Sequence, residues 1–137
     1  MHLKQRKTPD RDYFGMDQED YLHVIYLLTA KDTEARISAI AAALKVRKPS
    51  VSQMAERLKK QGYITYKPYQ ELTLTPKGRR VALAIHNRHE ALVDFFTAIG
   101  VPKKVQEHDI HGLEHYLSPI TLKKLQELTK KLRAAKH

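Results

Sequence analysis

Residues 37–62 read ISAIAAALKVRKPSVSQMAERLKKQG, a pattern typical of two short helices joined by a turn. The first helix is expected over residues 37–44, which are rich in alanine, with Ser38 as its N-cap. The second is expected over residues 50–61, where Pro49 suits the first helical turn. Apolar residues recur along it at helical spacing: Val51, Met54, Ala55 and Leu58. A small first helix packed on a second helix with an exposed polar face is a helix-turn-helix.

A predicted hairpin follows the second helix, whose expected C-cap is Gly62. Residues 63–66 and 71–75 are two short β-rich runs, and they flank the turn-like residues 67–70. A helix-turn-helix followed by a basic hairpin is a winged helix.

The flanking sequence is mainly helical in pattern. A helix that is apolar over much of its circumference is expected to start at Asp17, as N-cap, after a flexible N-terminal arm, residues 1–16. Further helices are expected over residues 81–99, closed by Gly100, and over residues 108–117 and 120–135. No apolar run is long enough to span a bilayer, and residues 1–15 lack the apolar segment of a secretory signal. We therefore expect no membrane partner and a cytoplasmic protein.

Positive charge is concentrated in one part of the 137 residues, whose formal net charge is +10. Residues 36–80 hold eleven Lys or Arg side chains against two acidic ones, Glu56 and Glu71, a local net charge of +9. Such a block favours a polyanion, because neutralised phosphates release condensed counterions. The alternative is a merely solubilising surface, and the confinement of the charge to one segment argues against it.

In a winged helix the second helix enters the major groove of DNA, and flanking residues contact phosphates. Arg47 and Gln53 are the base-reading candidates, because arginine pairs with guanine and glutamine with adenine in bidentate geometry. Further polar residues at the start of that helix are Lys48, Ser50 and Ser52. The phosphate-contact candidates are Lys59, Lys60, Lys67, Lys77, Arg79 and Arg80.

Histidines and carboxylates provide a second signal, in a chain that has no cysteine. Residues 108–115 contain three histidines and two acids, and His111, Glu114 and His115 would share one face of a helix. Each histidine alone is more often a surface or core residue. A metal site drawn from three helices would account for all of them together: Asp20, His23, His89, His111, Glu114 and His115.

At this point the chain resembles the diphtheria-toxin-repressor-like metalloregulators, and within them the manganese-transport-regulator branch, which lacks an additional C-terminal SH3-like domain. The resemblance covers about residues 17–120 and is carried by DYLHVIY (20–26), SVSQM (50–54), LTLTPKG (72–78), RHE (88–90) and GLEHYLS (112–118). The GLEH run at its distance from RHE is specific, whereas the wing segment is common among winged helices.

The resemblance implies a metal-ligand set that includes Asp20, His89, Glu114 and His115. His23 and His111 stand at two positions where the resemblance implies a glutamate in the manganese branch. The same two positions differ in the iron-responsive branch. The family resemblance suggests Mn²⁺ as the metal. Replacing two carboxylates by imidazoles instead favours Zn²⁺, Fe²⁺ or Co²⁺ over Mn²⁺.

The resemblance also implies a homodimeric, metal-activated repressor of metal-uptake genes that binds double-stranded operator DNA. We expect a mainly α fold, with a winged-helix DNA-binding domain over residues 17–78 and a helical dimerisation and metal-binding domain over residues 79–137. No catalytic residues and no small organic substrate are expected. The alternatives are a metal-independent winged-helix regulator and a His/Asp/Glu metallohydrolase.

Overall fold

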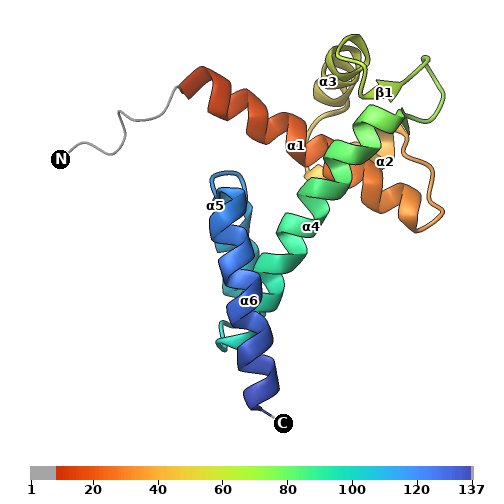
Figure 1. Cartoon of the computed structure of the whole chain (residues 1–137). Coiled ribbons are helices and arrows are strands. Elements are labelled where there is room, and N and C mark those ends of the chain that lie inside the picture. The colour runs from red at the N-terminus through yellow and green to blue at the C-terminus, as the bar shows by residue number, and fades with distance from the viewer. Residues whose placement is uncertain (1–8, 137) are drawn as a thin grey trace. The chain divides into compact units, whose positions relative to one another are not determined.

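The computed structural model describes residues 9–136, with side chains from residue 18 onward. The chain divides into two compact units, Met1–Ala84 and Ile85–His137. Their elements follow one another in the order α1 (Pro9–Ala30), α2 (Ile37–Leu44), α3 (Lys48–Lys60), β1 (Ile64–Thr65), β2 (Thr73–Leu74), α4 (Pro76–Ala98), α5 (Lys103–Leu113) and α6 (Pro119–Ala135) (Figure 1). Among the described residues, none of these helices is long and apolar enough to cross a membrane.

The predicted helix-turn-helix is present in the first unit, where α2 packs on both α1 and α3. Its core is formed by fully buried side chains from the three helices: Leu22, Ile25, Ile40, Val51 and Leu58. The N-cap of α2 is Arg36, without a side-chain cap, so the assignment of Ser38 as N-cap is wrong. Helix α3 begins at Lys48, two residues early, because proline is tolerated throughout the first turn and Pro49 fits its second position.

The C-cap of α3 is Gln61, so the assignment of Gly62 as C-cap is wrong by one residue, and Gly62 directly follows the cap. Its φ of 84° lies in the left-handed region, and its N–H bonds to the carbonyl of Lys59 while Tyr63 N–H bonds to the carbonyl of Leu58. This pair of hydrogen bonds is the Schellman motif that glycine favours.

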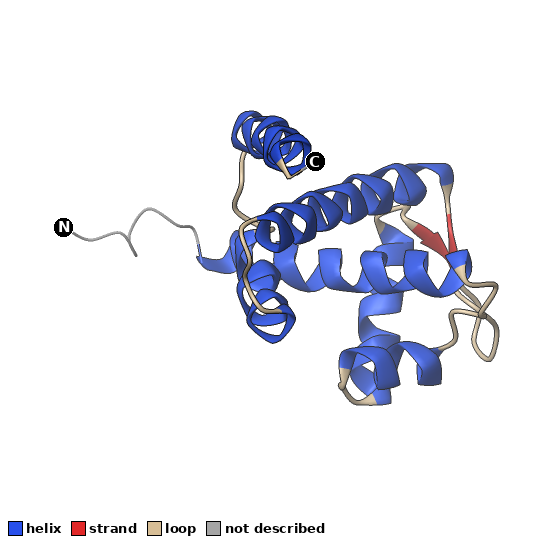
Figure 2. Cartoon of the chain, turned by 90° about the horizontal axis from the view of Figure 1, so that it is seen from below, coloured by secondary structure: helices blue, strands red, loops and turns tan. Residues whose placement is uncertain are grey.

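The predicted hairpin is the antiparallel pair β1 and β2, with Ile64 opposite Leu74. Its strands are very short beside the helices (Figure 2). The wing, residues 64–74, turns at Pro68 and Tyr69, where Gln70 N–H bonds to the carbonyl of Lys67 at 3.0 Å. Proline at the second position and a φ of 67° at Tyr69 are features of a type II turn.

Helix α1 starts at Pro9 rather than at Asp17, so Asp17 lies inside the helix and is not its N-cap. Proline at a helix start is pre-organised for helical φ, whereas the polar first turns lack apolar periodicity. Of the expected arm, residues 9–16 belong to α1, and residues 1–8 lie outside the described residues.

Helix α4 starts at Pro76, five residues before the predicted start at Val81. Thr75 caps it, because its Oγ1 accepts a hydrogen bond from Gly78 N–H at 3.0 Å. The same hydroxyl donates to the carbonyl of Gly62 at 2.6 Å, and Lys77 Nζ donates to the carbonyl of Gln61 at 2.8 Å. Hydrogen bonds from Thr75 and Lys77, at the start of α4, thus join α4 to the backbone carbonyls at the end of α3.

The second unit contains the rest of α4 with α5 and α6, and its core includes the fully buried Leu92 and Ile110. Gly100, at a φ of 86°, follows the end of α4 as predicted. The helix expected over residues 108–117 is α5, Lys103–Leu113, which starts and ends earlier. Its first turn follows Pro102 and contains a single apolar residue, the exposed Val105, so apolar spacing did not reveal it. Ser118 caps α6 by accepting a hydrogen bond from Thr121 N–H.

Candidate functional site

A buried carboxylate lies between two histidines in the second unit. Glu114 is the C-cap residue of α5 and only 4% exposed. Its Oε1 lies 2.8 Å from Nδ1 of His89 on α4, and its Oε2 lies 3.7 Å from Nε2 of His115 in the turn after α5. Two segments far apart in sequence therefore bring together one carboxylate and two imidazoles, three of the side chains predicted as metal ligands.

The hydrogen bond to Glu114 raises the pKa of His89 above the usual imidazole value, outweighing the desolvation that would lower it. The imidazole side chain of His115 is 3% exposed and that of His89 is 33% exposed. One face of the cluster is therefore deeply buried and the other is partly open to solvent.

His111 adds to the same cluster. Its ring packs edge to face with that of His115, with the ring centroids 5.9 Å apart. Because α5 ends at Leu113, the prediction that His111, Glu114 and His115 all lie within a helix is wrong. Glu114 nevertheless keeps helical dihedral angles, φ −60° and ψ −22°, so the local helical curvature continues past the end of α5.

Asp20 and His23 are placed in the first unit. Both are half-buried residues of α1, three positions apart, so they share one side of that helix.

The donors of the cluster suit a borderline divalent metal. Imidazole nitrogen and carboxylate oxygen are the ligands that Zn²⁺, Fe²⁺, Co²⁺ and Mn²⁺ accept in proteins without cysteine. Because the Glu114 carboxylate presents one oxygen to each of two imidazoles, hard oxygen donors and borderline nitrogen donors lie next to one another. The residues present therefore fit a metal.

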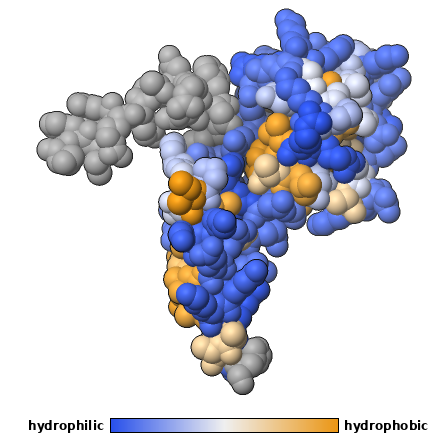
Figure 3. Space-filling view, viewed as in Figure 1, coloured by the Kyte–Doolittle hydropathy of each residue, from blue (hydrophilic) through white to orange (hydrophobic). Residues whose placement is uncertain are grey.

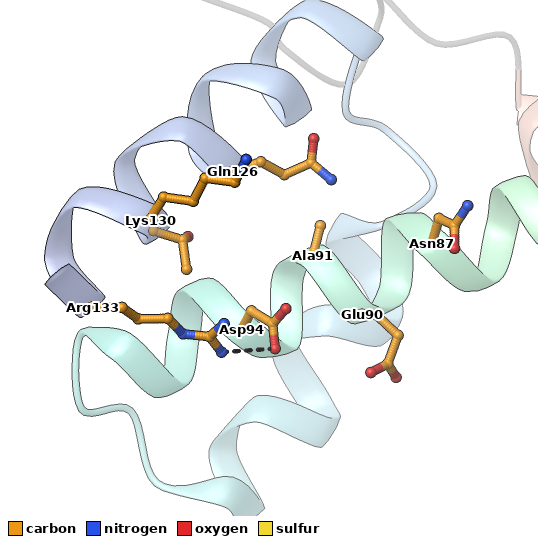
Figure 4. Close-up of a pocket in the computed structure, with 8 residues that line it drawn as sticks. Asn87, Glu90, Ala91, Asp94, Gln126, Lys130 and Arg133 are labelled. Carbon is orange, nitrogen blue, oxygen red and sulfur yellow. Dashed lines mark ion pairs between the residues drawn. The ribbon is translucent and has the colours of Figure 1, made fainter.

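A separate pocket of about 450 Å³ lies between α4 and α6 in the same unit (Figure 4). Charged side chains of both signs line it, including Glu90 and Lys130, and Arg133 pairs with Asp94 across it at 3.1 Å. None of the predicted metal ligands lines this pocket, so it is distinct from the cluster at Glu114.

The predicted DNA-contacting side chains are on the surface of the first unit. All are exposed except Ser52, which is half-buried: Arg47, Lys48, Ser50, Gln53, Lys59, Lys60, Lys67, Lys77, Arg79 and Arg80. Arg47 is the N-cap residue of α3, so it stands at the start of the helix whose polar face carries Gln53. Lys77 is also engaged within the protein, because its ammonium lies 4.6 Å from the centre of the Tyr63 ring and donates to Gln61.

Two residues with defined roles at this surface had no signal in the sequence. Arg36 donates to the backbone carbonyl of Tyr69 in the wing, and Thr75 joins α3 to α4. Both act through backbone carbonyls, which every residue has, so no side-chain pattern marks these partners.

Comparison with known protein families matches both units. Residues 14–72 match the model described as iron dependent repressor, N-terminal DNA binding domain. Residues 75–137 match that described as iron dependent repressor, metal binding and dimerisation domain. The chain belongs to the iron dependent repressor family. The predicted mainly α fold class is confirmed, and so is the predicted function class, a metal-dependent transcriptional regulator.

Individual relatives agree with this membership. The family member is 42% identical over 110 residues to the HTH-type transcriptional regulator MntR of Lysinibacillus sphaericus, covering 80% of this chain and 79% of that protein. Its fold resembles the manganese regulator SloR, with a TM-score of 0.72 at 24% identity. It also resembles a manganese-dependent transcriptional repressor solved with manganese, with a TM-score of 0.72 at 26% identity.

These structural alignments cover 82% of this chain and only 53% and 52% of the two solved chains. The chain therefore spans about half the length of those two solved proteins. The relative from Lysinibacillus sphaericus is named as a transcriptional regulator.

Proposed function

We propose that this protein is a repressor of metal-uptake genes whose binding to operator DNA is activated by a divalent transition metal. The observation that supports this most directly is the buried Glu114 carboxylate, with His89 and His115 on its two oxygens. The second support is the exposed basic surface on and around α3, in the unit that matches a DNA-binding domain.

The proposed ligand set extends the cluster of the second unit with His111 and with Asp20 and His23 of α1. Metal binding would then connect the DNA-binding unit to the dimerisation unit and favour one spacing of the two recognition helices in a dimer. Metal and DNA would be coupled ligands, each raising the affinity for the other. The family suggests Mn²⁺, whereas His23 and His111 favour Zn²⁺, Fe²⁺ or Co²⁺.

In the proposed complex with DNA, Arg47 and Gln53 read base edges in the major groove. The lysines and arginines of the basic block contact phosphates, which gives the binding a steep salt dependence. This division of labour is supported by the position of Arg47 and Gln53 on the N-terminal half of α3.

A homodimer is supported by exposed apolar side chains in the second unit, the unit that matches a dimerisation domain. Ile120 is 74% exposed and Ile99 is 51% exposed, and Val105 and Tyr116 are also exposed. Figure 3 shows hydrophobic patches of this kind among a mainly hydrophilic surface. We place the regulator in the cytoplasm, where it meets its operator, and assign it no catalytic activity.

The rival proposal is a metal-independent winged-helix regulator in which Glu114 and its histidines are only a buried polar network. A DNA-binding measurement separates the two. A duplex is selected from a randomised pool by the wild-type chain with Mn²⁺ or Zn²⁺, and binding is then followed by fluorescence anisotropy with and without metal.

We expect His89→Ala and Glu114→Gln to abolish the stimulation by metal while circular dichroism and dimer mass stay unchanged. His108→Ala is the matched control, because its imidazole is 91% exposed on the same helix as His111. Operator affinity that does not change with metal in the wild type and is unchanged in both site variants would support the metal-independent regulator and refute the metal proposal.

A further inference from the structure

We propose that Arg36 is the positioning residue of the wing, holding it so that Tyr69 at its tip contacts the DNA backbone beside the bases read by α3. The proposal rests on the proposed function, because it assumes that the first unit binds DNA. Neither residue is among the DNA contacts expected from the sequence.

Arg36 joins the loop before α2 to the tip of the wing. Its Nε donates to Glu34 Oε1 at 2.7 Å, and its Nη1 donates to the backbone carbonyl of Tyr69 at 2.9 Å. A backbone hydrogen bond from Leu72 N–H to the carbonyl of Ala35, 2.8 Å long, lies beside this bridge. The wing is therefore attached to the helix-turn-helix at two neighbouring points, one of them a guanidinium clamp.

The clamp needs the planar geometry of arginine. One guanidinium serves a carboxylate and a carbonyl at once, which a lysine ammonium on a flexible stem does not reproduce. Because Glu34 pairs with it, Arg36 brings little net charge to a phosphate. Its contribution is therefore the orientation of the wing.

Tyr69 has the features of a residue retained for binding. Its side chain is 94% exposed, so it buries almost no apolar area in the fold. Its φ of 67° is the left-handed conformation that bulky residues rarely adopt. Glycine would suit this turn position better, and strained residues of this kind cluster at functional sites.

The space between the wing and α3 fits a nucleic-acid backbone. A hollow of about 540 Å³ is lined on one side by Lys48 and Ser52 of α3 and on the other by Tyr66, Tyr69 and Arg36. Tyrosine and serine hydroxyls and lysine ammonium groups are common donors to phosphate oxygens. A backbone seated there would touch α3 and the wing together, so the orientation of the wing would affect binding directly.

The test uses the full chain and the duplex that the wild type selects from a randomised pool with Mn²⁺ or Zn²⁺. Hydroxyl-radical footprinting reports the sugars protected by the wing, and anisotropy reports affinity and its salt dependence. The variants are Arg36→Lys, Glu34→Ala, Tyr69→Gly and Tyr69→Phe, with Lys31→Met as a control that removes a charge from the same loop.

We expect Arg36→Lys to bind about tenfold more weakly, which corresponds to one charge-assisted hydrogen bond, and to lose protection at the flank of each half-site. Glu34→Ala should lose the same protection although it removes a negative charge, a change that electrostatics alone predicts to tighten binding. Tyr69→Gly should lose protection without a fall in melting temperature, because it relieves the positive φ. Tyr69→Phe should show whether the hydroxyl makes the contact, and Lys31→Met should keep the full footprint.

Two results would overturn the proposal while leaving the proposed function intact. One is wild-type affinity and footprint in Arg36→Lys, and the other is tighter binding with an intact footprint in Glu34→Ala. A wild-type chain that selects no duplex under any metal would refute the proposed function and this inference with it.

Discussion

Replacing Gly78 by alanine tests the junction between the wing and α4. A Cβ added at Gly78 would lie 1.9 Å from the carbonyl oxygen of Tyr63 and 2.9 Å from its carbonyl carbon, whereas ordinary contacts begin at 3.4 Å. The two backbones would have to separate by about 1.5 Å, which breaks the hydrogen bond from Thr75 N–H to Tyr63 O, now 3.0 Å. Backbone atoms cannot rotate away as a side chain would.

The expected cost of Gly78→Ala follows from these contacts. Overpacking against a fixed neighbour costs about 1 to 3 kcal/mol, and a lost buried hydrogen bond adds about 1 kcal/mol. The better helix propensity of alanine returns about 1 kcal/mol. We therefore expect a loss of about 1 to 3 kcal/mol in the free energy of unfolding, measured by urea denaturation of metal-free protein with far-ultraviolet circular dichroism.

Gly112→Ala is the matched control. No atom lies within 4 Å of a Cβ built at Gly112, which is also helical, so alanine there should be neutral or stabilise by about 0.5 to 1 kcal/mol. Equal denaturation midpoints for Gly78→Ala and the wild type would refute the argument that Tyr63 and α4 are rigidly packed.

Three further predictions concern the sites. In metal-free protein the imidazole of His89 should titrate above its usual pKa of about 6.5 and fall back toward it in Glu114→Gln, as followed by NMR; an unchanged midpoint would exclude Glu114 as the cause. The His89–Glu114 pair should stabilise the metal-free fold below about pH 6.5, and this contribution should be lost as the pH rises through the raised pKa of His89. Metal affinity should weaken as the pH falls through the same pKa. His23→Glu combined with His111→Glu should shift activation toward Mn²⁺ in binding titrations, and a wild type that already prefers Mn²⁺ over Zn²⁺ and Fe²⁺ would contradict this. Gln53→Ala should cost about 1 to 3 kcal/mol against particular base pairs, and an equal loss on random DNA would remove it from the base-reading residues.

The interiors of the helices could be predicted from the sequence, but their first turns could not. Apolar spacing identifies the buried face of each helix, and glycine at a left-handed position marks an end, as at Gly62. Five helices begin earlier than predicted, at Pro9, Lys48, Pro76, Lys103 and, by a single residue, Pro119. Polar first turns carry no apolar periodicity, and the backbone N–H groups there gain partners that the sequence does not reveal.

The candidate site shows the same limit. Local sequence brings Glu114 and His115 together, but it cannot place His89, which is 25 residues away from Glu114. The three-helix metal hypothesis included His89 and the family resemblance matched it, but only the packing of α4 beside the end of α5 shows its contact with Glu114. The addition of Asp20 and His23 to the ligand set stays a prediction.

The joint between α3 and α4 has a mechanical consequence. Thr75 and Lys77 hold the carbonyls of Gly62 and Gln61, so the end of the recognition helix and the start of α4 form one stiff corner. Helix α4 has 23 residues and is therefore roughly 34 Å long, with His89 just past its middle. A lever of this length converts a tilt of a few degrees into a displacement of a few ångströms at its far end. Because Thr75 and Lys77 fix this corner within the first unit, a rotation of the first turn of α4 is expected to rotate α3, the helix proposed to read DNA, along with it.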